Sequence, residues 1–319
     1  MRLAILASPD SWYARDLVRA AAGHDVSVLP FSSLSANLAT SGATAGLPSS
    51  AQSTAAIAGS SGSAPASGNS SLAITTGGQS LAAFDAVLVR TMPPGSLEQV
   101  VFRMDCLGRY EAQGGVVINP ARSIEAAVDK FLTSAKLAAA GLLTPRTICC
   151  QTPDEALAAF AALGGDVVLK PLFGSEGRGI TRLTDEALAV RAFKMLTQLG
   201  AVLYLQEFIP HEGFDYRLLV IGERVLAIRR RNPTDWRTNI SRGAVAEPFE
   251  PDAGLVALAR QGAAAVGALV AGVDLLPGRD GRLYVLEVNA VPGWKGLARA
   301  QGIDVAKLVI DYTASRVRR

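Results

Sequence analysis

Hydrophobic and polar residues alternate in short blocks at the start of the chain, and these blocks predict a strand, a helix and a second strand. Residues 2–7 form an apolar run, residues 11–22 follow a helical pattern, and residues 25–29 form another apolar run. Strand–helix–strand order is typical of the opening of a βαβ unit with a parallel sheet. We therefore expect the chain to begin with an α/β domain.

The pattern is lost over residues 35–80, where serine, alanine, glycine and threonine dominate. No charged residue occurs between Val26 and Phe84. Such a tract buries too little apolar surface per residue to offset the entropy lost on ordering. We expect a low-complexity, flexible surface insertion without secondary structure; the alternative is that the tract packs against the body of the protein.

Regular patterning returns after this tract and continues to the end of the chain. The expected elements are strands at 83–90, 116–120 and 147–150, and helices at 97–113, 123–140 and from 153 onward. Thr152, followed by a proline and two acids, has the chemistry of a helix N-cap. The first domain is expected to close near residue 123.

Two polar residues interrupt the apolar strand predicted near the C-terminus. Glu287 and Asn289 are two positions apart, so in a strand they point to the same face, and Leu286 and Val288 point to the other. The turn at 278–281 predicts a hairpin that brings Asp274 beside them. Carboxylate and amide oxygens of this kind suit Mg²⁺. The alternative is a solvated strand face.

A lysine ends the apolar strand predicted at residues 167–170, and a glycine-rich loop at 173–179 follows it. A loop between two strands can offer backbone N–H groups to phosphates. It is not a Walker P-loop, because no Gly-Lys-Ser/Thr opens a helix here. Lys170 suits a phosphate contact, and Lys130 is a second candidate. The alternatives are a simple hairpin and an ordinary exposed helix lysine.

Arginines are dense from residue 217 to residue 242. Residues 215–231 read as a hairpin that turns at Gly222 and Glu223, and further arginines follow it. Anionic substrates or a triphosphate would account for this density. The alternatives are a solvated basic face and a contact with RNA.

Composition adds few constraints. The chain has 319 residues, 49% of them hydrophobic, and a formal net charge of +3, which by itself does not indicate DNA or RNA. The three cysteines, Cys106, Cys149 and Cys150, lack metal-ligand spacing and argue against a disulfide framework, so we expect a cytoplasmic protein. We expect no membrane association, because no apolar run is long enough to span a bilayer.

Taken in order, these motifs resemble those of the ATP-grasp carboxylate–amine ligases, most closely the RimK-like α-L-glutamate ligases. The motifs are Lys130, Lys170 with its glycine loop, Gln206-Glu207-Phe208-Ile209, Asp215-Tyr216-Arg217, Arg237-Thr238-Asn239 with Arg242-Gly243, Asp274, and Glu287-Val288-Asn289. The resemblance covers about residues 83–312. It implies an α/β plus α+β fold: a Rossmann-like pre-ATP-grasp domain (1–123), then a two-subdomain ATP-grasp fold (124–205 and 206–319).

The resemblance also implies roles for individual residues. ATP would be held by Lys130, Lys170, Gly177, Gly179, Glu207, Ile209, Asp215 and Arg217. The phosphates, the reacting carboxylate or the amino acid would be engaged by Arg231, Arg237, Asn239 and Arg242. Two Mg²⁺ ions, for which Mn²⁺ can substitute, would be bound by Asp274, Glu287 and Asn289.

The implied reaction joins an amino acid, expected to be glutamate, to a small-molecule carboxylate through an acyl phosphate. The chain departs from the family pattern in its insertion, in Ala244, and in Trp294 after the Pro-Gly pair. Trp294 resembles a subset linked to pterin or one-carbon cofactors and could stack on a flat ring, or it could be a core anchor. We therefore expect a pterin-type acceptor; the alternatives are a ribosomal-protein glutamate ligase and a basic RNA-associated protein without ATP chemistry. Whether the chain forms a homo-oligomer is left open.

Overall fold

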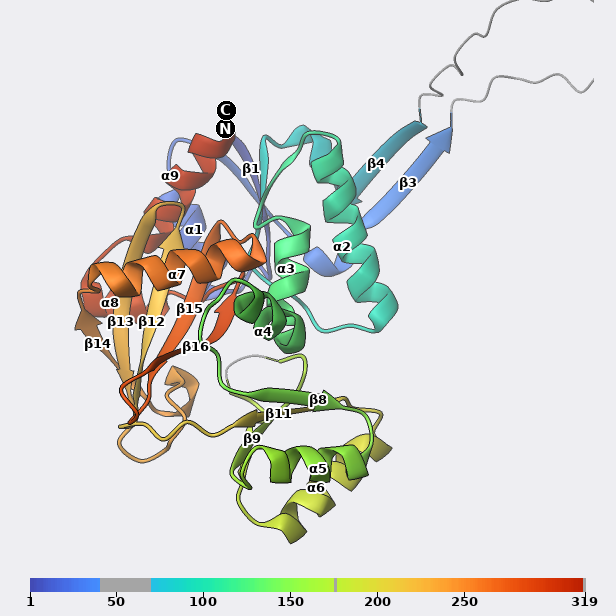
Figure 1. Cartoon of the computed structure of the whole chain (residues 1–319). Helices are drawn as coiled ribbons and strands as arrows, with labels where there is room; N and C mark the ends of the chain where they lie inside the picture. Colours follow the sequence, from blue (N-terminus) through green and yellow to red (C-terminus); the bar gives the residue numbers. More distant parts are fainter. Residues whose placement is uncertain (41–69, 175–176, 318–319) are drawn as a thin grey trace, which may run out of the picture.

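The computed structural model describes residues 1–40, 70–174 and 177–317 (Figure 1). Its first domain is built on a parallel sheet in the order β2-β1-β6-β7. The elements of this domain are β1 (Arg2–Leu6), α1 (Trp12–Ala20), β2 (Asp25–Leu29), β6 (Ala86–Val89), α2 (Leu97–Ala112), β7 (Val116–Ile118) and α3 (Ala121–Val128). The expected α/β opening domain is thus confirmed.

A small antiparallel sheet lies beside this domain, and two of its strands extend away from the body (Figure 1). It comprises β3 (Ser35–Thr40), β4 (Ser70–Thr76) and β5 (Gln79–Ser80), and the short helices Phe31–Ser33 and Leu81–Ala83 flank it. The prediction that 35–80 lacks secondary structure is therefore wrong at both ends, and residues 41–69 lie outside the described residues. The physical reason is Ile74, which is 3% exposed and packs in the domain core.

The second sheet is antiparallel, in the order β10-β9-β11-β8, and lies at the bottom of Figure 1. Its elements are β8 (Thr147–Cys150), α5 (Pro153–Ala162), β9 (Val167–Lys170), β10 (Thr181–Leu183), α6 (Glu186–Gln198) and β11 (Leu203–Glu207). Phe160 and Phe193 pack from the two helices onto Leu169 and Leu205 of the sheet. As predicted, Thr152 caps α5 by accepting a hydrogen bond from the Glu155 backbone N–H.

The third sheet has five antiparallel strands in the order β14-β13-β12-β15-β16. Its strands are β12 (Phe214–Ile221), β13 (Arg224–Arg231), β14 (Val245–Phe249), β15 (Val270–Pro277) and β16 (Leu283–Asn289), and the short helix Ile240–Arg242 precedes β14. Helix α7 (Ala253–Val266) packs on one face; α8 (Lys295–Gln301) and α9 (Val305–Val317) pack on the other. Both predicted hairpins are confirmed.

The helical region after the first domain differs from the prediction. Instead of one helix over 123–140 there are two, α3 and α4 (Lys130–Ala139), separated at Asp129. The Asp129 carboxylate accepts a hydrogen bond from the Leu132 backbone N–H at 3.0 Å, and this cap starts the second helix. Helix α4 contacts α7 and β16. It therefore packs with the five-stranded sheet.

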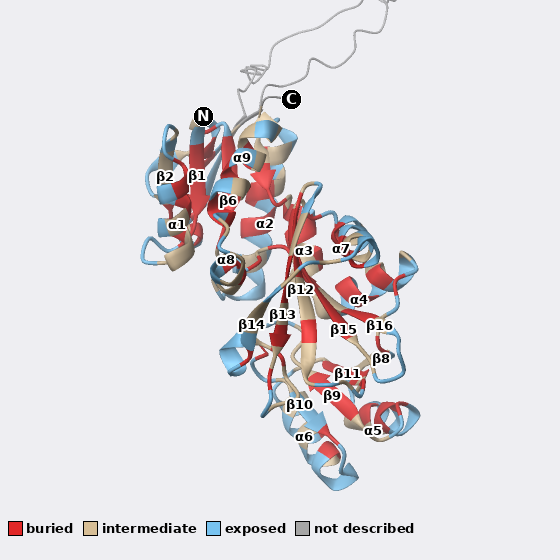
Figure 2. Cartoon of the chain, turned by 90° about the vertical axis from the view of Figure 1, so that its left-hand side faces the viewer, coloured by how far each residue is buried: buried red, intermediate tan, exposed pale blue. Residues whose placement is uncertain are grey.

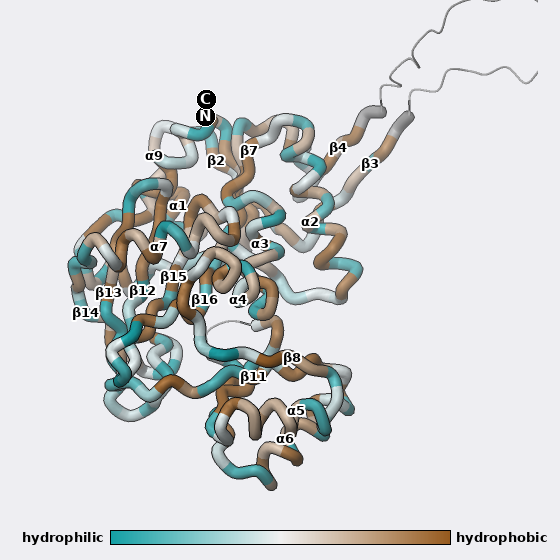
Figure 3. Tube along the Cα trace, viewed as in Figure 1, coloured by the Kyte–Doolittle hydropathy of each residue, from teal (hydrophilic) through white to brown (hydrophobic). Residues whose placement is uncertain are grey.

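The C-terminal helix α9 returns to the first domain and contacts α1, β6 and β7 (Figure 2). Leu3, Leu17, Val305 and Val309 share one buried cluster. Loops at the lower ends of β12–β15 are largely hydrophilic (Figure 3). Within the described part of the chain, no helix combines the length and the apolar character needed to cross a membrane.

Candidate active site

Two lysines from different elements line one cavity between the second and third sheets. Lys170 ends β9, and its Nζ donates to the Gln206 side-chain oxygen at 2.5 Å. Lys130 begins α4, and its Nζ donates to the Gly174 backbone oxygen at 2.9 Å. Burial lowers the pKa of Lys170 to about 8 and also lowers the pKa of Lys130, while Glu287 opposes both shifts. The two lysines thus lie in the field of a carboxylate.

That carboxylate comes from the hairpin of β15 and β16, where Asp274 and Glu287 are cross-strand partners. Both line the same cavity as the lysines. Burial, and then the proximity of Asp274, raise the pKa of Glu287. Keeping both acids charged side by side is unfavourable, and a bound cation would offset this because it favours the charged form of each.

An irregularity in this hairpin corrects one part of the sequence-based prediction. The register shifts between Asp274 and Leu275, so Leu275 pairs with Val285 and Leu286 has no direct partner. We expected Leu286 on the face opposite Glu287, but both line the cavity. The extra residue of a β-bulge changes the alternation of side chains. Leu286 joins Ile209 and Leu276 in an apolar wall beside the charged groups.

A buried ion network lies behind the acids. The Arg230 guanidinium donates to both carboxylate oxygens of Asp215 and pairs with Asp274 at 2.9 Å. Arg217 pairs with the other oxygen of Asp274 at 2.5 Å, and the Thr238 hydroxyl donates to Asp215 at 2.6 Å. Burial acts to raise the pKa of Asp274, but Arg217 and Arg230 outweigh it and hold that pKa below its ordinary value. The positive charges of two arginines therefore balance the negative charges of two aspartates.

The two neighbouring arginines at the end of β13 lie on opposite faces of the strand, and only one of them lines the cavity. We expected Arg231 there, but the structure places Arg230 in the cavity. Arg231 alternates to the other face, where it lies 5.1 Å from the Phe214 ring and 3.8 Å from Glu247. Its side chain is 41% exposed, against 8% for Arg230. The correction follows from the period of two along a strand.

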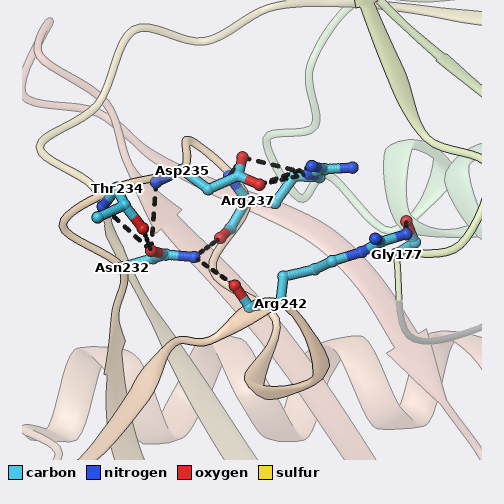
Figure 4. Close-up of polar contacts among 6 residues, drawn as sticks. All are labelled: Gly177, Asn232, Thr234, Asp235, Arg237 and Arg242. Atoms are coloured by element: carbon cyan, nitrogen blue, oxygen red, sulfur yellow. Dashed lines mark hydrogen bonds and ion pairs between the residues drawn. The ribbon is translucent and has the colours of Figure 1, made fainter.

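A loop between β13 and β14, drawn in Figure 4, contributes Arg237 and Asn239 to the lining of the cavity. Its shape is held by Asn232, whose amide nitrogen donates to the backbone oxygens of Arg237 and Arg242 at 2.8 and 3.1 Å. The Arg237 guanidinium is bound to Asp235 at 2.6 Å. The Arg242 guanidinium reaches the glycine-rich loop and donates to the Gly177 backbone oxygen at 3.2 Å.

The glycine-rich loop meets this arginine-bearing loop closely at one point. Gly177 has φ +69°, and a Cβ there would lie 2.6 Å from the Asn239 side-chain oxygen. Both the backbone conformation and the space therefore require glycine. Both loops line the cavity that contains the lysines.

Of the residues selected from the sequence, the structure brings most to this cavity. Its lining includes Lys130, Lys170, Gly177, Glu207, Ile209, Asp215, Arg237, Asn239, Asp274 and Glu287. The other candidates are described by the structure but do not line the cavity: Gly179, Arg217, Arg231, Arg242 and Asn289. The Asn289 side-chain oxygen accepts from the Val291 backbone N–H at 2.9 Å.

The lining also includes polar residues that are not among those selected from the sequence, and two of them, Arg230 and Gln206, form hydrogen bonds to candidate site residues. Gln206 is buried, accepts from Lys170, and donates to the hydroxyls of Thr147 and Tyr204 at 3.0 and 3.1 Å. The signal for Gln206 was available: a polar residue in a buried strand, on the same face as Tyr204, which pairs with Lys170.

The chain is similar to known proteins both in sequence and in structure. The model of the RimK-like ATP-grasp domain matches residues 127–313, more than half of the chain. The chain belongs to the RimK-like ATP-grasp family. RimK-like ATP-grasp proteins are ATP-dependent ligases, and the cavity described above lies within the matched region.

Relatives of this RimK-like chain include two named tetrahydromethanopterin:alpha-L-glutamate ligase. The one from Methanosarcina acetivorans is 32% identical over 261 residues, covering 73% of this chain and 80% of the relative. The one from Methanococcus maripaludis is 35% identical over 238 residues, with the same coverage. A probable alpha-L-glutamate ligase from Sodalis glossinidius is 33% identical over 244 residues, covering 75% and 81%.

Solved structures show the same fold over almost the whole chain. The ATP-grasp ligase PsnB complexed with its minimal precursor has a TM-score of 0.70 at 23% identity and covers 98% of each chain. A RimK domain ATP-grasp protein from Sphaerobacter thermophilus has a TM-score of 0.66 at 25% identity and covers 98% of this chain and 99% of that one. PsnB has also been solved with Mg and ADP, at a TM-score of 0.69, 22% identity and coverage of 99% of this chain and 98% of that one. The expected ATP-grasp fold is confirmed.

The donor set of this RimK-like site fits Mg²⁺. Among the described residues, no group of three or more His, Cys, Asp or Glu side chains could hold a metal ion alone. Asp274 and Glu287 supply two carboxylates, and Mg²⁺ is typically bound by one or two carboxylates together with substrate phosphates. The two lysines of the cavity are suited to hold those phosphates.

Trp294, which we proposed as a stacking surface for a flat acceptor, lies elsewhere. It is 1% exposed, and its ring nitrogen donates to Asp16 at 3.1 Å. The rings of Tyr13 and Trp294 meet edge to face at 5.1 Å, and the Arg90 guanidinium lies 4.3 Å from the Trp294 ring. Trp294 is therefore a core anchor against the first domain, and the stacking interpretation is wrong.

Proposed function

We propose that this chain forms an amide bond between a carboxylate and an amino acid, through an acyl phosphate made from ATP. The observation that carries the proposal is the pair of lysines, Lys130 and Lys170, in one cavity with the paired acids Asp274 and Glu287. The reacting end of a triphosphate needs two kinds of group: cations that bind its phosphates, and carboxylates that bind its Mg²⁺. The two lysines and the two acids supply them.

Each part of the cavity has a role in this proposal. Lys130 and Lys170 hold the phosphates, with backbone groups of the glycine-rich loop. The apolar wall of Ile209, Leu276 and Leu286 packs on the adenine, beside Glu207. Arg237 and Asn239 lie on the loop that borders the phosphates and engage them or the reacting carboxylate.

Metal ions complete the proposed site. Asp274 and Glu287 bind Mg²⁺, Asn289 is a further ligand, and two ions are bound, for which Mn²⁺ substitutes. Mg²⁺ supplies charge neutralisation between the triphosphate and the attacking carboxylate.

Two steps follow from this arrangement. A carboxylate oxygen attacks the γ-phosphorus of ATP, and the bond to ADP breaks. The amine nitrogen then attacks the acyl carbon, phosphate leaves, and the amine loses a proton. The contribution of the chain is mainly to position the reactants and to balance charge.

We further propose glutamate as the amine and a pterin-type carboxylate as the acceptor. Both choices are supported by the names of relatives at 32–35% identity. In three species these relatives are named tetrahydromethanopterin:alpha-L-glutamate ligase. The buried position of Trp294 removes the stacking argument for the pterin.

The proposal is tested by measuring ADP release and product mass with ATP, Mg²⁺, glutamate and candidate carboxylates. We expect ADP release and a gain of one glutamyl unit on the pterin-type compound. Glutamylation of a ribosomal protein alone would reject the pterin acceptor and keep the chemistry. Absence of ADP release with every carboxylate and amino acid tried, together with no thermal stabilisation by Mg-ATP, would refute the ligase proposal.

A further inference from the structure

One residue of the first domain makes an unusual set of contacts with the strands that bear the site. Asn119 follows β7, is 2% exposed, and forms four hydrogen bonds. Its amide nitrogen donates to the backbone oxygens of Val270 at 2.7 Å and Ala290 at 2.5 Å. Its oxygen accepts from the backbone N–H groups of Leu269 at 2.7 Å and Val270 at 2.8 Å. Four is the full capacity of an asparagine side chain.

These partners belong to both strands of the hairpin that carries the acids. Val270 begins β15, which bears Asp274, and Ala290 directly follows β16, which bears Glu287 and ends at Asn289. The two strands are adjacent in the sheet, with Gly272 opposite Asn289. Asn119 therefore bridges the start of one strand and the end of the other, through backbone groups that are more than a hundred residues away along the chain.

A second residue from the same edge of the first domain holds the chain just beyond. Arg90 follows β6, the neighbour of β7 in the parallel sheet. Its Nη1 donates to the Pro292 backbone oxygen at 2.9 Å, and its guanidinium lies over Tyr13 and Trp294. Burial lowers the pKa of Arg90 to about 10. The segment after Asn289 is thus fixed at successive points by residues of the first domain.

We propose that Asn119 is a positioning residue for the metal site, and that Arg90 assists it. This inference rests on the proposed function, because it requires Asp274, Glu287 and Asn289 to bind Mg²⁺. Asn119 sets how β15 and β16 lie against each other at the end of the hairpin that contains Asn289. At this end the Asn289 side-chain oxygen accepts a hydrogen bond from the Val291 backbone N–H. The first domain thereby determines metal geometry without contributing a ligand. Loss of a hydrogen bond that orients a metal ligand typically lowers metal affinity by about 10–100-fold.

The test separates metal binding from nucleotide binding and from stability. ADP binding to the full chain is measured by calorimetry at a series of Mg²⁺ concentrations and in EDTA. Mg²⁺ is expected to increase the affinity for ADP, and the Mg²⁺ midpoint is the concentration at which half of this increase is reached. For Asn119→Ala we expect the Mg²⁺ midpoint to rise about tenfold. The affinity for ADP in EDTA should be unchanged. The matched control is Ile74→Ala, which removes buried side-chain atoms from the first domain in a strand that does not pair with β15 or β16.

The outcomes are distinct. An unchanged Mg²⁺ midpoint in folded Asn119→Ala, or an equal shift in Ile74→Ala, would reduce Asn119 to a structural residue and overturn the inference. An equal loss of ADP affinity in EDTA would also overturn it. If Asn119→Ala does not fold, Arg90→Met serves instead, because it removes the donor to Pro292 at similar volume; a raised midpoint supports the inference and an unchanged one overturns it. Wild-type protein whose ADP binding ignores Mg²⁺ would refute the proposed function itself.

Discussion

Replacing Arg230 by methionine should cost this protein a large part of its stability. The side chain is 8% exposed and is hydrogen-bonded to Asp215 and paired with Asp274. Methionine fills similar space but leaves Asp215 without its guanidinium partner, since the other arginine of the network, Arg217, pairs with Asp274. Removing one partner of a buried ion pair typically costs about 3–5 kcal/mol. We expect a loss of this size in the free energy of unfolding at pH 7.

The neighbouring residue provides the control. Arg231→Met removes a side chain that is 41% exposed and lies 3.8 Å from Glu247, and an exposed pair contributes about 0–1 kcal/mol. Both variants are measured by urea unfolding followed by far-ultraviolet circular dichroism. We expect a large shift of the midpoint for Arg230→Met and a small one for Arg231→Met, with equal slopes.

The pH dependence has a defined sign. The pKa of Asp274 is held below its ordinary value in the folded protein, so its stabilising contribution is present above that ordinary value and is lost as the pH falls. In Arg230→Met the pKa values of Asp215 and Asp274 rise, because both lose a guanidinium partner. The loss of unfolding free energy relative to wild type should therefore become smaller from pH 7 toward pH 4. Equal losses in Arg230→Met and Arg231→Met, or a deficit that grows on acidification, would refute this account of the network.

The remaining predictions concern the cavity and the first domain. Glu287→Ala should abolish ADP formation and leave the circular dichroism spectrum intact, and turnover near the wild-type rate in Mg²⁺ would show that the metal site is elsewhere. Lys170→Met should raise the KM for ATP and lower kcat, because a phosphate contact is lost; an unchanged ATP dependence would return Lys170 to a structural role. Ile74→Ala should lower the free energy of unfolding by about 2–5 kcal/mol, and an unaltered melting temperature would show that β4 adds little to the core.

Much of the fold could be predicted from the sequence, because most elements carry their own local signal. The hairpin of β12 and β13 is an example: its turn at Gly222 and Glu223 was recognised from the pattern. That same turn pairs residue 221 with 224, and therefore Asp215 with Arg230. The predicted turn therefore already implies that Arg230 is the partner of Asp215, although the family resemblance points to Arg231.

Other features could not be read from the sequence. The bulge that places Leu286 in the cavity depends on how β16 pairs with β15, and nothing in the apolar run at 283–288 marks it. The contacts of Trp294 with Asp16 and Arg90 join segments that are distant along the chain. In both cases tertiary packing, rather than local propensity, decides where a side chain lies.

The return of α9 to the first domain has a consequence for how the protein is made. Leu3 and Leu17 leave the ribosome well before Val305 and Val309, with which they share a buried cluster. At ordinary synthesis rates these partners are separated by a delay on the order of tens of seconds. Throughout that delay the apolar side of β1 and α1 lacks its final cover, so the nascent chain should be a client for chaperones until α9 emerges.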